Sequence, residues 1–163
     1  MPALSSLEKP AASLPKGTWL TPMGYAHLRE RIDVIRKTVL DELRPHLMGP
    51  ERDERDVATF ERGLAEIARL ETLLAVAQPL PVPATGRGAR VMPGALVELE
   101  RLGSAPERFR VRIVHPVEAT MDEERISWDS PLARVVLGAS VGEVLTVASP
   151  AGSWECIVRR IRA

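Results

Sequence analysis

The chain has 163 residues, enough for one ordinary domain or two small ones. Its 22 lysines and arginines balance 22 aspartates and glutamates, so no global field draws it to nucleic acid or to an anionic membrane. We therefore expect no membrane partner and no sequence-specific DNA binding, although a local basic patch is compatible with a neutral total.

The single cysteine, Cys156, excludes an internal disulfide and any metal site built from several cysteines. It lies in a strand-like run, residues 154–158, where a buried small residue is expected. The residues before Trp19 lack the long apolar core of a secretory signal, and no run reaches transmembrane length. These features favour the cytoplasm.

Residues 1–17 are predicted to be a disordered leader. A helix should then begin with Thr21 as its N-cap and Pro22 at its first position. Pro45 is expected to kink or end this helix near Arg44, because proline cannot continue a helix unchanged. The helix has one apolar seam at spacings of three and four: Leu28, Ile32, Ile35, Val39, Leu43 and Leu47.

A second seamed helix is predicted after the Gly49-Pro50 breaker. Its seam contains Val57, Phe60, Leu64, Ile67, Leu70, Leu74 and Ala77. Neither helix can bury its stripe alone, so we expect an antiparallel hairpin. Each helix would span roughly 35–40 Å, so residues 18–80 should form a projecting coiled-coil arm with its tip near residues 45–56.

The predicted tip concentrates negative charge. Its four carboxylates, interrupted by Arg52 and Arg55, are Glu51, Asp53, Glu54 and Asp56. If the second helix begins at Pro50, steps of about 100° put Asp53 and Asp56 on the seam side, while the two glutamates point away. The alternative is that these acids only complement the helix dipole or pair with the arginines.

The period changes beyond a proline- and glycine-rich linker at residues 81–89. Residues 95–100 and 109–114 alternate apolar with polar, as half-buried strands do, and two more strands are expected at 143–147 and 154–161. Between the two pairs, Ser130, Pro131 and Gly138 predict a short helix with an N-cap, a first-position proline and a terminating glycine. The fold class is therefore α+β, with residues 90–163 forming a mostly antiparallel sheet and one helix.

Several motifs together resemble the bacterial Gre transcript-cleavage factors and their homologues. Residues 20–28 (Leu-Thr-Pro-Met-Gly-Tyr-Ala-His-Leu) and 67–71 are similar to parts of the family's arm, and residues 125–133 (Arg-Ile-Ser-Trp-Asp-Ser-Pro-Leu-Ala) with 137–138 and 141–144 are similar to its globular domain. The resemblance covers residues 18–163. It implies an FKBP-like C-terminal domain docked at the rim of the secondary channel of RNA polymerase, with the arm inserted toward the active centre.

The resemblance also gives the tip a role. The family places an aspartate and a glutamate, three residues apart, beside the catalytic magnesium of the polymerase, and Asp53 and Asp56 are the nearest counterparts here. Mg²⁺ (or Mn²⁺) prefers oxygen ligands, and a second metal held this way activates water for phosphodiester hydrolysis. The factor would then act through the polymerase, near the nascent RNA 3′ end, with no catalytic site or cofactor of its own.

The implied docking residues are Asp129, Ser130, Pro131 and Leu132, which also simply start a helix. Trp128 is either an exposed binding residue or a core aromatic. Basic residues on the first helix could face nascent RNA but are typical outer-face charges; they are Arg29, Arg31, Arg36 and Lys37. Among the histidines, which lack ligand spacing, His46 is the one near the tip.

The sequence departs from the cleavage pattern. The family's Gly-Asp-Leu-x-Glu-Asn tip is absent, Arg52 and Arg55 intrude, and the arm is about one heptad short. Because catalytic positioning tolerates errors of only about 1 Å, these features favour a modulator or inhibitor, as in anti-Gre homologues. The alternatives are a cleavage-stimulating factor and a free-standing isomerase or chaperone, whose pocket would need Phe109, Trp128 and Trp154.

Overall fold

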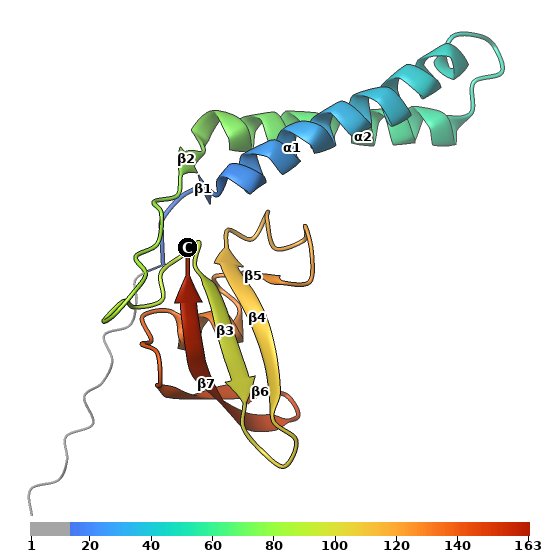
Figure 1. Cartoon of the computed structure of the whole chain (residues 1–163). Helices are drawn as coiled ribbons and strands as arrows, with labels where there is room; N and C mark the ends of the chain where they lie inside the picture. The colour runs from blue at the N-terminus through green and yellow to red at the C-terminus, as the bar shows by residue number, and fades with distance from the viewer. Residues whose placement is uncertain (1–13) are drawn as a thin grey trace, which may run out of the picture. The chain divides into compact units, whose positions relative to one another are not determined.

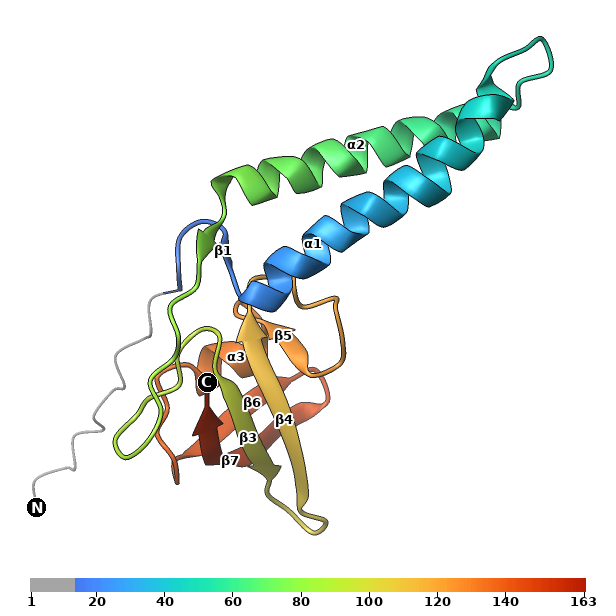
Figure 2. The ribbon, with the colours of Figure 1, turned by 45° about the horizontal axis from the view of Figure 1, so that its top comes forward.

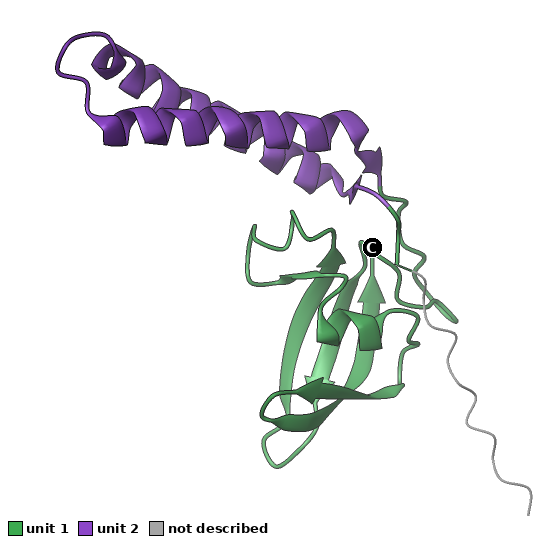
Figure 3. Ribbon diagram, turned by 180° about the vertical axis from the view of Figure 1, so that it is seen from behind, with its two compact units in different colours: residues 1–16, 80–163 green, residues 17–79 purple. Residues whose placement is uncertain are grey.

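The computed structural model describes residues 14–163, so the predicted leader lies outside the described residues except for residues 14–17. Residues 17–79 form one compact unit and residues 80–163 the body of a second (Figure 3). The expected mixture of helix and sheet is confirmed. None of the helices in residues 14–163 is long and apolar enough to cross a bilayer.

The first unit is a helical hairpin closed by a short parallel strand pair (Figure 1). Strand β1 (Trp19–Leu20) pairs with β2 (Gln78–Pro79). Between them run α1 (Pro22–Ile35) and α2 (Glu54–Val76), which pack against each other. The predicted start of α1 is confirmed: Thr21 is its N-cap, and the Thr21 Oγ1 accepts a hydrogen bond from the Gly24 amide at 3.1 Å.

The first helix does not remain an α-helix to its end. It continues from α1 into a π-helical segment, η1 (Arg36–Asp41), and finishes as a 3-10 helix, η2 (Arg44–Leu47). The change to 3-10 geometry at Arg44 confirms the expected effect of Pro45, which removes a backbone donor. The π segment was not predicted. It brings Leu40, which is 6% exposed, into the buried stripe after Leu28 and Ile32.

The predicted seam of α2 was wrong at one position. Leu64 is 47% exposed, and the neighbouring Gly63 is buried in its place. A Cβ at Gly63 would lie 2.9 Å from Val39 Cγ1 and 3.4 Å from Leu40 Cδ2, so the two helices approach closely where the π segment faces this glycine. Ile67 and Leu70 continue the buried stripe as predicted.

The second unit is built on a five-stranded sheet of order β5-β4-β3-β7-β6 (Figure 2). Its elements are β3 (Leu96–Arg101), β4 (Glu107–Val114), β5 (Arg125–Ser127), α3 (Pro131–Val136), β6 (Val144–Ser149) and β7 (Gly152–Arg162). Every pairing is antiparallel except β4 with β5, which confirms the mostly antiparallel sheet. The helix α3 packs against β6.

The alternation of the strands decides which face of the sheet is buried. Val97 and Leu99 of β3 and Val111 and Ile113 of β4 all face the core and are at most 4% exposed. Cys156 of β7 is fully buried, as predicted, and burial raises the pKa of its thiol. The opposite face carries the charged residues of the same strands.

Candidate functional site

The turn that joins the two helices is the first candidate site. After η2, Met48 is extended and 83% exposed, and Gly49 has a φ of 143°, a conformation that favours glycine. The chain then turns through residues 50–51 and enters α2 at Glu54. The expectation that the second helix begins at Pro50 was therefore wrong.

This later start gives Asp53 a defined structural role. It is the N-cap of α2, and its Oδ1 accepts a hydrogen bond from the Arg55 amide at 2.8 Å. The Asp53 backbone carbonyl accepts the amides of Asp56 and Val57 at 3.1 and 3.2 Å. Because Asp53 is not in the helix, the helical phase that grouped it with Asp56 does not apply to it.

The remaining tip charges are free of internal partners. Within residues 14–163, the side chains of Arg52 and Arg55 make no ion pair with the neighbouring acids, so the arginines do not neutralise the tip as the alternative interpretation supposed. Glu51 and Glu54 are exposed, whereas Asp56 is half-buried. Glu54 and Asp56 also lie in the first turn of α2, where the helix dipole stabilises negative charge.

An open depression of about 510 Å³ lies beside the tip. It is lined by Pro50, Arg52, Glu54, Val57, Ala58 and Glu61, and so includes neither Asp53 nor Asp56. The described residues bring no three histidine, cysteine, aspartate or glutamate side chains together in a metal-binding group.

Two ion pairs join the helices behind the tip. Arg31 Nη2 lies 3.0 Å from Glu66 Oε1, and Arg36 Nη2 lies 2.6 Å from Glu71 Oε1. Arg31 and Arg36, which the sequence offered as RNA-facing residues, are thus engaged across the hairpin. Each pair links residues far apart in sequence and helps to fix the register of the two helices.

The second candidate site is the segment that starts α3. Ser130 is the N-cap, with its Oγ accepting the Ala133 amide at 3.2 Å, and Pro131 is the first helical residue, as predicted. Asp129 and Pro131 are exposed and Leu132 is half-buried. The Ser127 hydroxyl donates a hydrogen bond to Asp129 Oδ1, which holds this carboxylate at the surface.

Trp128 does not contribute to that surface. It is 5% exposed, and its indole packs edge-on against the His115 ring with centroids 5.2 Å apart. The exposed-tryptophan interpretation was wrong because β5 pairs in parallel with β4 and the Trp128 amide donates to the Val114 carbonyl at 2.9 Å, which draws the side chain into the core.

His115 lies next to the segment that precedes α3. Its Nδ1 accepts the Val117 amide at 3.1 Å, so the neutral ring carries its proton on Nε2. Burial lowers the pKa of His115, and the nearby charge of Asp129 opposes that shift. His115 had no predicted role, and only its place after a buried strand could have indicated one.

The aromatic residues needed for a common isomerase pocket lie in separate groups. Phe109 and Trp154 pair with ring centroids 6.2 Å apart, and the Arg101 guanidinium lies 5.1 Å from the Trp154 ring. Trp128 instead packs with His115. This arrangement argues against a single pocket lined by all three.

Comparison with known proteins supplies the family. Residues 87–162 match the family model described as transcription elongation factor, GreA/GreB, C-terminal. The transcription elongation factor GreA of Methylococcus capsulatus is 35% identical over 154 residues, which cover 89% of this chain and 97% of that protein. The chain belongs to the GreA/GreB family.

Members of this family with a different name are similarly close to it. The transcription inhibitor protein Gfh1 of Thermus aquaticus is 31% identical over 144 residues, covering 83% of this chain and 90% of that protein. The crystal structure of GreA factor homolog 1 of Thermus thermophilus is 31% identical, covers 91% of this chain and 100% of that one, and has a TM-score of 0.42. Identity alone thus does not separate an elongation factor from an inhibitor.

Proposed function

We propose that this GreA/GreB family member binds RNA polymerase and restrains elongation, pausing or transcript cleavage. The start of α3, on an FKBP-like domain, would dock at the rim of the secondary channel. The hairpin, acting as a coiled-coil arm, would enter the channel and bring its tip near the active centre and the nascent RNA 3′ end. The chain would act through the polymerase, without catalysis of its own.

The inhibitory part of this proposal rests on the charged side chains at the tip that have no ion-pair partner within the chain's described residues. Asp53 already accepts a backbone hydrogen bond, and the side chains of Arg52 and Arg55 remain free beside it. Two guanidinium groups next to a prospective metal site repel a divalent cation, which weakens metal delivery. Occupation of the channel by this tip needs no metal and fits the same geometry.

A magnesium ion shared with the polymerase is part of the alternative function. Asp56 and the free Oδ2 of Asp53 would supply at most two carboxylates, with the polymerase providing the other ligands. When bound, such an ion supplies an activated water for phosphodiester hydrolysis. The chain's own residues would only position it, and a cleavage-stimulating factor would result.

A backtracked elongation complex tests the proposal. We expect the added protein to slow transcript cleavage, and faster cleavage would contradict it in favour of the alternative. Asp53→Ser with Asp56→Asn removes both charges while keeping an N-cap hydroxyl, and should abolish the effect without loss of binding. The matched control, Glu30→Gln with Asp33→Asn, removes two acids from α1 and should behave like the wild type.

The docking segment is tested separately by polymerase binding. Asp129→Asn and Pro131→Ala should each weaken binding, because both residues are exposed at the start of α3. Unchanged affinity in both variants would exclude this docking site. Ser149→Ala, at the end of the edge strand β6, serves as the control at a distant exposed position of the same unit.

A further inference from the structure

The outward face of the sheet gathers arginines although the chain is neutral overall. Along β4 the outward arginines are Arg108, Arg110 and Arg112, and along β7 they are Arg159, Arg160 and Arg162. The two sets form columns on either side of β3, whose outward acids are Glu98 and Glu100. We call these six arginines the arginine face.

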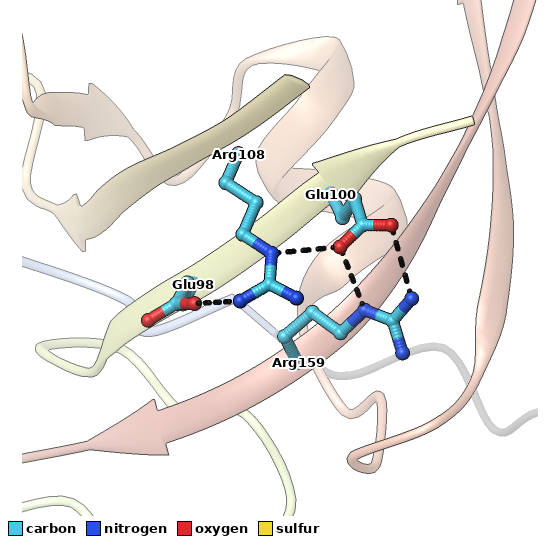
Figure 4. Close-up of polar contacts among 4 residues, drawn as sticks. All are labelled: Glu98, Glu100, Arg108 and Arg159. Carbon is cyan, nitrogen blue, oxygen red and sulfur yellow. Dashed lines mark hydrogen bonds and ion pairs between the residues drawn. The ribbon is translucent and has the colours of Figure 1, made fainter. Parts of the chain in front are cut away.

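Ion pairs engage half of the arginine face, and Figure 4 shows those made by Arg108 and Arg159. Glu100 accepts hydrogen bonds from Arg108 Nε at 2.8 Å and from Arg159 Nη2 at 3.0 Å, and these bonds lower the pKa of Glu100, with Arg159 the larger cause. Glu98 lies 3.6 Å from Arg108. Arg110 pairs with Glu124, at 2.9 Å, beside the other edge of β4. These contacts are sufficient to explain three of the arginines.

The other half has no acidic partner. Arg112 donates to the Gly94 carbonyl at 2.8 Å, which orients a guanidinium without neutralising it. Within the described part of the chain, no carboxylate pairs with Arg160 or Arg162, and both are exposed. Three of the six arginines therefore have no carboxylate partner, although the outward Glu155 of β7 adds one further acid on this side of the sheet.

The face has no apolar centre of the kind that protein partners use. The outward apolar residues of β3 and β7, Leu96 and Ile157, are half-buried and lie in different rows of the sheet. Ile157 pairs with Val144 of the edge strand β6, which is 51% exposed, so this apolar pair lies at the margin of the face and not between its two columns. Binding residues at protein interfaces cluster in desolvated apolar pockets, whereas nucleic-acid backbones are bound by arginine and lysine on polar surfaces. The chemistry of this face thus fits phosphate groups better than it fits a protein.

We propose that the arginine face binds the phosphate backbone of duplex DNA without reading its sequence. Neighbouring strands lie about 4.8 Å apart, so the columns of β4 and β7 are about 10 Å apart. The minor groove of B-form DNA is about 6 Å wide, and long arginine side chains from the two columns reach the phosphate rows on either side of it. Glu98 and Glu100 then face the groove. A single-stranded nucleic acid lying along β3 would instead bring its phosphates next to these two carboxylates, which would repel them.

Fluorescence anisotropy with the full chain and a labelled duplex of mixed sequence tests this surface without polymerase, so its outcome is independent of the proposed function. Three phosphate contacts predict a slope of about −2.7 in log K against log salt, or roughly 40-fold weaker binding between about 50 and 200 mM salt. Arg160→Gln with Arg162→Gln should reduce the slope by about 1.8. Circular dichroism confirms that this variant is folded.

The control variant removes the same charge elsewhere. Arg62→Gln with Arg87→Gln changes two exposed arginines outside the arginine face and should leave the slope unchanged. The proposal is overturned if the duplex does not bind at about 50 mM salt, or if both double variants weaken binding equally. Tighter binding of a single-stranded RNA or of a polyglutamate peptide than of the duplex would also overturn it, and would assign the face to that partner instead.

Discussion

The two helices of the hairpin approach each other closely at Gly63, so the effect of an added methyl group on stability can be estimated from the structure. The substitution Gly63→Ala adds one methyl group to α2. In an ordinary exposed helix this change stabilises by about 1 kcal/mol, because alanine has the higher helix propensity. At Gly63 the new Cβ would lie 2.9 Å from Val39 Cγ1, 3.4 Å from Leu40 Cδ2 and 3.5 Å from Ile35 Cγ2.

The nearest of these contacts decides the sign. A separation of 2.9 Å requires movement, and Val39 is β-branched with little rotamer freedom in a helix. Overpacking of a filled site costs about 1–3 kcal/mol, which exceeds the gain in propensity. We therefore expect Gly63→Ala to lower the free energy of unfolding of the hairpin by about 1 kcal/mol.

A double-mutant cycle isolates the contact. In a Val39→Ala background the obstructing Cγ1 is gone, so Gly63→Ala should then stabilise the hairpin by about 1 kcal/mol. The coupling energy between the two positions should be about 2 kcal/mol. Urea unfolding followed by far-UV circular dichroism measures all four chains, with the hairpin transition fitted separately because the chain has two units. Stabilisation by Gly63→Ala of equal size in both backgrounds would refute this reasoning.

The remaining predictions concern caps and titrating groups. Ser130→Ala removes the N-cap of α3 and should destabilise the sheet unit by about 1 kcal/mol in urea unfolding, whereas Ser130→Thr should be nearly neutral. The hydrogen bond from Arg69 lowers the pKa of Glu66 in the folded hairpin. The ionised Glu66 therefore stabilises the hairpin fully above its unfolded pKa, and this stabilisation is lost as the pH falls through the folded pKa. Glu66→Gln should remove this part of the hairpin's acid sensitivity, at most about 1 kcal/mol. Burial lowers the pKa of His115, so stability should rise with pH between its folded pKa and 6.5, and an NMR titration of the ring should give a midpoint below 6.5.

Local chemistry was enough to predict the ends of several elements. Thr21 and Ser130 each accept the amide three residues later, and each is followed by proline at the first helical position. These signals depend only on neighbours in sequence, so no tertiary information was needed. The four longer strands, β3, β4, β6 and β7, were equally predictable, because one face of the sheet is buried and the alternation records it. The strands β1, β2 and β5 were not predicted, because two or three residues are too few to show a period.

The hairpin seam was predictable except at Leu40 of the π segment and at Gly63 and Leu64 of α2. A π-helix has more residues per turn than an α-helix, and in this segment both Val39, which was predicted, and its neighbour Leu40, which was not, face Gly63 of α2. A count at spacings of three and four therefore missed Leu40, and it missed Gly63 because a glycine has no apolar side chain to count. At the tip, the helical phase was counted from Pro50, but α2 begins at Glu54, so Asp53 is its N-cap and not a helical residue.

Net charge was the least informative property of the sequence, since it records a sum and not a placement. The inward positions of β4 and β7 must be apolar, so every arginine of these strands that alternates with a core residue is placed on the same outward face. A pattern such as Arg108, Arg110 and Arg112 therefore specifies a charged surface even in a neutral chain. A chain of zero net charge can still attract nucleic acid at one surface. In ordinary salt, screening limits the reach of each charge to about 10 Å, so distant acids do not cancel a cluster of arginines.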